Sequence, residues 1–269
     1  MHIAMHRIET EYGCANLSLF LHDQIPGAEP SCLKPFMVVL PGGGYNHLST
    51  REGEPVALRW FSLGFNACIL HYSVAPAQYP VALIELAYTV GWIRSNSKTL
   101  NVDKGRIYVC GFSAGGHLAG CLGAKWADPA LSKATKLCQE AMRPDALVLC
   151  YPVISAGQYG HHDSFKVLCG DNTELAASLS LENLVTKSFP PTFIWHTADD
   201  HSVSVENSLL LASALSQAKV EFTLHIFPHG GHGSALATRE TALAGHNDQI
   251  QPLAQLWPEL CAQWLSSIS

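Results

Sequence analysis

Hydrophobic and polar residues follow two different patterns along the chain. Residues 3–9 and 15–22 alternate between the two types, which is typical of antiparallel strands at the edge of a sheet. Continuous apolar runs then predict buried parallel strands at residues 36–40, 67–72, 107–110, 146–150, 192–197 and 222–227. Helices are expected between these runs, at residues 53–62, 81–95, 114–126, 205–217 and 250–268.

This order of elements predicts the fold class. Two edge strands are followed by six strands that alternate with helices, which indicates an α/β fold with an eight-stranded, mostly parallel sheet and helices on both faces. A Pro- and Gly-rich loop is expected at residues 25–35. No repeat or linker divides the chain, so we expect a single domain over residues 1–269. Only residues 154–188 and 235–247 are long enough to shape a pocket, so any cap over the sheet is minimal.

The third apolar run ends in the most informative motif of the chain, Gly111-Phe112-Ser113-Ala114-Gly115. It has the form G-x-S-x-G, in which a serine occupies a sharp turn between a buried strand and a helix. Side chains at Gly111 or Gly115 would collide with neighbouring elements in so tight a turn. The turn holds the hydroxyl at the carboxyl edge of the sheet, above a helix N-terminus whose amides favour negative charge. Ser113 is therefore the candidate nucleophile.

A serine nucleophile needs a base, and the base needs an orienting acid. Asp199 and Asp200 follow the seventh predicted strand, and His229 and His232 follow the eighth, so the order serine, acid, histidine is present. We expect Asp200 to be the acid and Asp199 to be a turn or cap residue. We expect His232 to be the base, because the glycines beside it let the loop approach the serine, and His229 to be an ordinary loop histidine.

Three consecutive glycines, Gly42-Gly43-Gly44, follow the first parallel strand. Backbone amides in such a loop can stabilise the negative oxygen of a tetrahedral intermediate, together with the amide of Ala114 directly after the nucleophile. A phosphate-binding loop is the alternative interpretation. It fails on pattern, because no Lys-Ser/Thr follows the glycines and no G-x-G-x-x-G opens a helix.

Composition narrows the classes of function. The 269 residues are 48% hydrophobic and 14% charged, with a net charge of −6 and no cluster of Lys or Arg, which argues against nucleic acid as a partner. No apolar run approaches the ~18 residues of a membrane span. The first residues lack the apolar region of a signal peptide, so we expect a cytoplasmic protein. Nine cysteines without a C-x-x-C pair indicate reduced side chains rather than a disulfide framework.

Four blocks of this sequence together resemble the α/β-hydrolase superfamily. Within it, the chain is similar to the small esterase/lipase group of bacterial acetyl esterases and acetyl-xylan-esterase-like proteins. The similarity runs from about residue 36 to the C-terminus, and the residues that carry it are 41–45, 111–117, 196–200 with 205–208, and 229–233.

The resemblance implies a role for each candidate residue. Ser113 would be the nucleophile, Asp200 the acid and His232 the base, with an oxyanion hole formed by the amides of Gly43, Gly44 and Ala114. One position departs from the family pattern: Pro41 stands where the lipase-type loop usually begins with histidine. The amide donors remain, but the histidine that braces the loop is missing, which places the chain nearer to the sugar-ester-like branch.

The resemblance and the minimal cap also imply the substrate. We expect hydrolysis of short acyl esters without a cofactor, with an acetyl group on a sugar or xylo-oligosaccharide as the leading candidate. Amide hydrolysis, as in formamidases or peptidases, uses the same parts and stays open at this point. A binding protein that has lost catalysis is the third hypothesis, and it usually needs a damaged triad.

Two further groups of side chains could contribute to a site. Tyr45 and Tyr151 follow strand ends and are candidates for lining the substrate pocket, with plain packing as the alternative. Several closely spaced histidines suggest a metal, but no H-E-x-x-H is present and adjacent histidines on an extended segment point apart, so we expect no metal. The histidines concerned are His161, His162, His225, His229 and His232.

Overall fold

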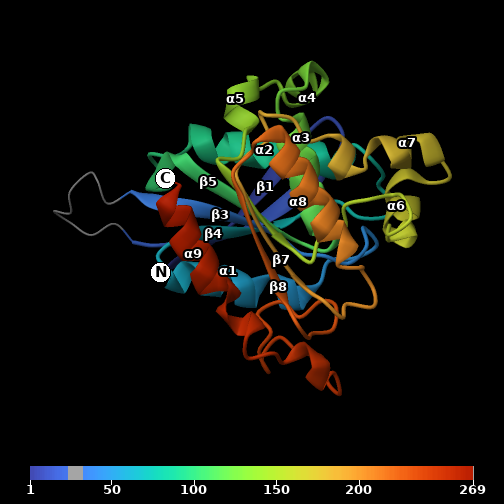
Figure 1. The fold of residues 1–269 in the computed structure, drawn as a ribbon. Coiled ribbons are helices and arrows are strands. Elements are labelled where there is room, and N and C mark those ends of the chain that lie inside the picture. The colour runs from blue at the N-terminus through green and yellow to red at the C-terminus, as the bar shows by residue number, and fades with distance from the viewer. Residues whose placement is uncertain (24–32, 269) are drawn as a thin grey trace.

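One eight-stranded sheet runs through the centre of the protein (Figure 1). The computed structural model describes residues 1–23 and 33–268. The strands lie side by side in the order β1-β2-β4-β3-β5-β6-β7-β8. Their bounds are β1 His2–Glu9, β2 Cys14–Leu21, β3 Lys34–Leu40, β4 Asn66–His71, β5 Val102–Phe112, β6 Ala146–Cys150, β7 Thr192–Thr197 and β8 Phe222–Phe227.

The strand directions confirm the fold class. Strand β2 is antiparallel to both of its neighbours, β1 and β4, whereas every pairing among the six strands from β3 to β8 is parallel. The parallel strands β3 and β6 have a core of apolar residues with almost no exposed surface. This is the burial that a sheet covered on both faces requires, and it explains why these strands are continuous apolar runs. Because the six strands point the same way, their carboxyl ends meet at one edge.

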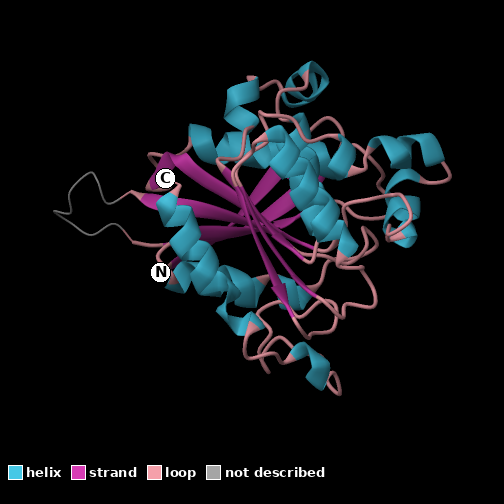
Figure 2. Cartoon of the chain, viewed as in Figure 1, coloured by secondary structure: helices cyan, strands magenta, loops and turns pink. Residues whose placement is uncertain are grey.

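Helices cover both faces of the sheet (Figure 2). Helices α1 (Glu54–Ser62) and α9 (Trp257–Ser267) pack on one face, and α2 (Val81–Ser95), α3 (Ala114–Lys125) and α8 (Glu206–Ala218) pack on the other. The shorter helices are α4 (Pro129–Thr135), α5 (Gln139–Met142), α6 (His162–Cys169) and α7 (Thr173–Ser178). Each face of the sheet therefore has its own hydrophobic core.

Three buried tryptophans fix the helices on the first face. Trp257 of α9 lies edge-on to Trp60 of α1, with 5.8 Å between ring centroids, and stacks on Trp195 of β7 at 5.6 Å. All three side chains have no exposed surface. Aromatic pairs at such spacings add directional contacts to the burial of apolar area. They hold the last turn of α1 and the first turn of α9 close to β7.

Some elements differ from the expectation. Helix α9 begins at Trp257 rather than at residue 250, with Pro258 in its first turn, where the missing N–H is not needed. Helices α4 and α5 were not expected, because four to seven residues are too few to show an apolar period. The loop predicted at residues 25–35 falls mostly outside the described residues, and the chain is already a strand from Lys34.

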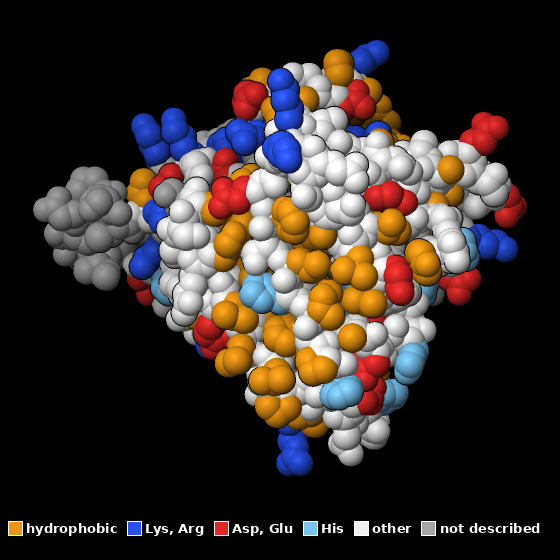
Figure 3. All heavy atoms as spheres, in the orientation of Figure 1, with side chains coloured by type: hydrophobic (Ala, Val, Ile, Leu, Met, Phe, Trp, Pro, Cys, Tyr) orange, Lys and Arg blue, Asp and Glu red, His pale blue; other side chains and the backbone are white. Residues whose placement is uncertain are grey.

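The surface agrees with the low charge of the sequence. Hydrophobic side chains gather in the middle of the face drawn in Figure 3, and Lys and Arg lie mainly toward its edges.

The eight cysteines within residues 1–23 and 33–268 are all free thiols. In the same part of the chain, no helix combines the length and the hydropathy needed to cross a membrane.

Candidate active site

Ser113 lies on a strained turn between β5 and α3. Its backbone has φ 52° and ψ −117°, a conformation that non-glycine residues rarely adopt. A Cβ at Gly111 would overlap the carbonyl oxygen of Gly115, so the tight approach of strand and helix requires glycine there. The Ser113 amide donates to the Cys150 carbonyl oxygen at 3.0 Å, and its own carbonyl oxygen accepts from Val153 at 3.1 Å. These bonds to the neighbouring segment hold the turn in place.

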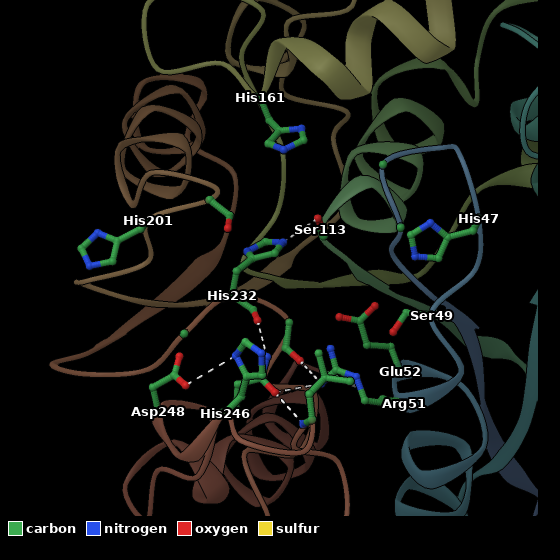
Figure 4. A pocket seen from close by; sticks show the side chains of 17 residues that line it. His47, Ser49, Arg51, Glu52, Ser113, His161, His201, His232, His246 and Asp248 are labelled. Atoms are coloured by element: carbon green, nitrogen blue, oxygen red, sulfur yellow. Dashed lines mark hydrogen bonds and ion pairs between the residues drawn. The ribbon is translucent and has the colours of Figure 1, made fainter.

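The side chains of Ser113, His232 and Asp200 form one hydrogen-bonded chain. His232 Nε2 lies 2.9 Å from Ser113 Oγ, a contact drawn in Figure 4, and His232 Nδ1 lies 2.7 Å from Asp200 Oδ2. A carboxylate only accepts, so Nδ1 carries the ring proton and Nε2 is left to accept the serine proton. The three residues follow β5, β8 and β7, and they meet because these strands end at the same edge of the sheet.

Both carboxylate oxygens of Asp200 accept hydrogen bonds. Oδ1 accepts the amides of Ser202 and Val203, each at 2.9 Å, while Oδ2 lies 3.3 Å from His196 Nε2 as well as accepting from His232. The residue is 6% exposed. Burial by itself raises the pKa of the carboxyl, but the hydrogen bonds from His196 and His232 outweigh it and hold the pKa well below the ordinary 3.8.

The lowered pKa of Asp200 predicts an acid-dependent contribution to stability. Because the pKa is lower in the folded state, this contribution is fully present above the unfolded value, near 3.8, and is lost as the pH falls through the folded value. We therefore expect the difference in melting temperature between wild type and Asp200→Asn to be constant above about pH 5 and to shrink below pH 4. Thermal melts across this range measure it, and a difference that grows toward low pH would contradict the assignment.

Asp199 and His229 form a separate pair at the rim of this edge. Asp199 Oδ2 lies 2.9 Å from His229 Nδ1, and Oδ1 accepts the Gly230 amide at 2.8 Å. Their side chains are 43% and 72% exposed. The pair therefore fixes the turn after β8, and within the described chain neither side chain is hydrogen-bonded to Ser113, as expected for a turn residue and a loop histidine.

The glycine loop after β3 presents backbone amides beside the serine. Gly43 and Gly44 have positive φ values, 125° and 63°, and both line the same cavity as Ser113. Within the described residues, the amides of Gly43, Gly44 and Ala114 donate to no other group. The amide of Gly42, by contrast, donates to Glu52 Oε2 at 2.8 Å. The loop thus divides into one anchored amide and two that are available to a ligand.

The prediction that Tyr45 and Tyr151 line the substrate pocket differs from the structure. Both residues are 2% exposed, and neither contributes to the cavity wall. The Tyr45 hydroxyl contacts His117 Nδ1 at 2.8 Å, and the Tyr151 hydroxyl donates to Glu52 Oε1 at 2.7 Å. Buried hydroxyls need such partners, and the partners found here turn both rings into the protein.

His117 of α3 contacts Tyr45, the residue directly after the three glycines. Burial lowers its pKa to about 4, so the ring is neutral at physiological pH. Its Nε2–H donates to the Leu179 carbonyl oxygen at 2.9 Å, which leaves Nδ1 to accept from Tyr45. This histidine is therefore a buried core residue with both ring nitrogens hydrogen-bonded.

A cavity of about 510 Å³, lined mainly by residues with polar side chains and by glycines, opens over Ser113 (Figure 4). Of the described residues that line it, Leu243 alone has an apolar side chain. His161 comes from the segment 154–188, and Leu243 and His246 come from the segment after residue 235, as expected. Sequence reasoning missed the other polar residues of the wall, which are His47, Ser49, Arg51, Glu52, His201, Ser202, Asp248 and Gln249.

Arg51 ties the loop that bears His232 to the turn before α1. Its Nη1 donates to the carbonyl oxygens of Gly233 and Thr241, each at 2.7 Å, and to Gln249 Oε1 at 3.2 Å. Gln249 in turn donates to the His232 carbonyl oxygen at 2.8 Å. Arg51 and Gln249 thus hold the backbone carbonyl groups of His232 and of the residue after it. Over the part of the chain that the structure describes, no three His, Cys, Asp or Glu side chains are grouped to hold a metal ion.

Comparison with known proteins places the chain in a family. The BD-FAE family model matches residues 25–215. An endo-1,4-beta-xylanase B of Butyrivibrio fibrisolvens is 36% identical over 242 residues, and an acetylxylan esterase of Xylanibacter ruminicola is 27% identical over 247. The matches cover 87% and 86% of this chain but only 37% and 45% of those proteins, so the chain spans less than half of each.

Solved structures cover more of the chain. An acetyl ester-xyloside bifunctional hydrolase from Caldicellulosiruptor lactoaceticus is 41% identical with a TM-score of 0.80, covering 94% of this chain and 88% of that one. The carboxylesterase Cest-2923 from Lactobacillus plantarum is 31% identical with a TM-score of 0.88, covering 99% and 98%. The chain therefore belongs to the BD-FAE family and is an esterase-like α/β-hydrolase.

Proposed function

We propose that this protein is a serine carboxylic-ester hydrolase that removes short acyl groups, in particular acetyl groups from a sugar or xylo-oligosaccharide. The hydrogen-bonded chain from Ser113 through His232 to Asp200, at the floor of an open cavity, is the observation that carries the proposal. No cofactor is required for this chemistry. The names of the relatives, which include an acetylxylan esterase, support the choice of substrate.

The proposed reaction has two halves. His232 Nε2 takes the proton of Ser113 as the serine oxygen bonds to the ester carbonyl carbon, and then gives this proton to the leaving alcohol as the ester C–O bond breaks. A water molecule then bonds to the acyl carbon while His232 takes its proton; the bond between this carbon and Ser113 Oγ breaks, His232 returns the proton to Ser113, and the carboxylic acid leaves. Asp200 holds the imidazole in the required tautomer and stabilises its positive charge. Ser113, Asp200 and His232 are thus the proposed catalytic residues.

The oxyanion formed in each half needs hydrogen-bond donors. We assign this role to the amides of Gly43, Gly44 and Ala114, which border the serine and donate to no group of the described chain. Donors fixed before the reaction stabilise developing charge without reorganising, and loss of one such donor typically costs a factor of about 10²–10³ in kcat. The strained turn at Ser113 keeps the serine oxygen and these amides together.

The residues that line the cavity favour an ester with a polar alcohol and a short acyl group as the substrate. A wall of histidine, serine and carboxylate side chains can bind sugar hydroxyls, and among the described lining residues Leu243 is the one apolar side chain that a long acyl chain could contact. The sequence predictions of a single domain, a cytoplasmic location and no nucleic-acid partner remain part of this proposal.

A substrate series tests this assignment. We expect kcat/KM to be highest for aryl acetate and to fall by about tenfold or more by the octanoyl ester, because each methylene would extend along a polar wall. Acetylated xylo-oligosaccharides are expected to be deacetylated, and N-formyl amides to be cleaved far more slowly. A maximum at long acyl chains, or faster cleavage of the amides, would contradict the proposed substrate class.

A further inference from the structure

Glu52 connects two loops that come from distant parts of the chain. It ends the short 3₁₀ turn Thr50–Glu52 and is 2% exposed. Its Oε2 accepts the Gly42 amide of the glycine loop at 2.8 Å, and its Oε1 accepts the Tyr151 hydroxyl at 2.7 Å. A buried carboxylate is costly unless its oxygens are hydrogen-bonded, and both oxygens of Glu52 are. This carboxylate was not among the candidates from the sequence.

The first bond of Glu52 fixes the glycine loop. Gly42 donates its amide to Glu52, and its carbonyl oxygen accepts from the Ser49 amide at 3.0 Å. The peptide plane that contains this carbonyl also contains the Gly43 N–H, which points the opposite way. Fixing both polar groups of Gly42 therefore fixes the direction of the Gly43 amide.

The space around Gly42 shows how closely these parts approach. A Cβ at this position would lie 2.9 Å from Glu52 Oε2 and 2.9 Å from Ser113 Cβ. The Glu52 carboxylate, the backbone of Gly42 and Ser113 are therefore packed so closely that no side chain fits at position 42. A small movement of Glu52 would shift the loop relative to the serine.

The second bond of Glu52 reaches the histidine loop. The Tyr151 hydroxyl, which donates to Glu52, accepts the Ala235 amide at 2.9 Å. The Tyr151 ring also lies edge-on to the His232 imidazole, with 5.1 Å between centroids. The position of this ring therefore depends on Glu52 and supports the face of the imidazole.

We propose that Glu52 is a positioning residue for the ester hydrolysis proposed above. Its carboxylate keeps the oxyanion loop and the His232 loop in one fixed relation, and so braces a loop that begins with Pro41 instead of histidine. The two oxygens of a carboxylate can accept from both the Gly42 amide and the Tyr151 hydroxyl, whereas a glutamine has one acceptor oxygen and turns an NH₂ group toward the other donor. The inference rests on the proposed function.

Glu52→Gln tests this proposal, because it preserves size while removing one of the two bonds. We expect kcat to fall by about 10–100-fold with KM changed by less than about threefold, since the lost alignment matters most in the transition state. The inhibition constant of an aryl trifluoromethyl ketone should rise by a similar factor, because its tetrahedral adduct uses the same amides. Tyr151→Phe keeps the Gly42 bond and is expected to lower kcat by about 3–10-fold.

Glu85→Gln is the matched control. Glu85 is a carboxylate with no exposed surface, whose Oε2 and Oε1 accept the Ser73 amide at 2.7 Å and the Ser73 hydroxyl at 2.6 Å. It thus has the same kinds of bond as Glu52 but takes no part in the cavity wall. We expect this variant to lose thermal stability and keep its kcat within about twofold. Equal kcat for the Glu52→Gln and Glu85→Gln proteins would overturn the inference.

Two further outcomes separate this inference from the function on which it rests. If wild type hydrolyses no ester, or if Ser113→Ala remains active, the proposed function fails. Glu52 is then judged by the rate at which the organophosphate paraoxon labels Ser113, measured by peptide mass spectrometry, and equal rates in wild type and Glu52→Gln would overturn the inference. If Glu52→Gln does not fold, an unchanged kcat in Tyr151→Phe would do the same.

Discussion

Ser113→Ala is expected to lower kcat for an aryl acetate by roughly 10⁴-fold or more, because no other group can form the acyl-enzyme. The variant should fold normally, since it loses one hydroxyl that is bonded only to His232 in the described chain. Circular dichroism and the melting temperature check the fold, and initial rates over a range of ester concentrations check the loss. An active Ser113→Ala protein would remove the basis of the proposed mechanism.

Asp200→Asn is expected to lower kcat by about 10⁴-fold, and Asp199→Asn by less than twofold. Asparagine at position 200 turns either an NH₂ group or a weaker acceptor toward His232 Nδ1, so the imidazole loses the tautomer that leaves Nε2 free to accept the serine proton. Asp199 bonds instead to the exposed His229 at 2.9 Å, at the rim of the site.

The comparison of these two neighbours is a strict test of the acid. Both substitutions remove one negative charge at nearly the same place in the chain, so a general change in net charge would affect both equally. Steady-state kinetics with the same ester at the same pH measures the difference. A large loss of kcat in Asp199→Asn together with a nearly normal kcat in Asp200→Asn would show that Asp199, and not Asp200, is the acid.

Periodicity was sufficient to predict the sheet. Apolar runs mark the buried strands β6 and β7, whose predicted bounds agree with the structure. The predicted bounds of β8 agree as well, although this strand lies at the edge of the sheet and is only partly buried. The same ordering placed Ser113, Asp200 and His232 after strand ends, where parallel strands bring distant residues together. The motif alone also predicted that Gly111 and Gly115 have no room for a side chain, as the structure shows.

Residues that act through buried contacts could not be found in this way. Arg51 and Glu52 precede a helix, where charged residues usually face solvent, and nothing in the local pattern shows that Glu52 is 2% exposed. Its role depends on Gly42 and Tyr151, which are 10 and 99 residues away in the sequence. Tyr151 shows the converse error, because an aromatic residue at a strand end suggested a pocket wall and is instead a buried link.

The polar wall of the cavity also required the structure. His47, His161, His201 and His246 come from four separate loops, each of which by itself shows only a histidine among turn residues. Their convergence depends on loop conformations that hydrogen bonds such as those of Arg51 determine, and the binary pattern does not encode these bonds. The choice of substrate therefore rests on geometry and on relatives more than on periodicity.

Covalent labelling of wild type with paraoxon tests the central claim most directly. The reagent phosphorylates an activated serine and mimics the tetrahedral stage of ester hydrolysis. We predict one label per chain, located by peptide mass spectrometry on Ser113, with loss of esterase activity in proportion to labelling. Full inactivation with the label on another residue, or full labelling of Ser113 with activity retained, would contradict the account.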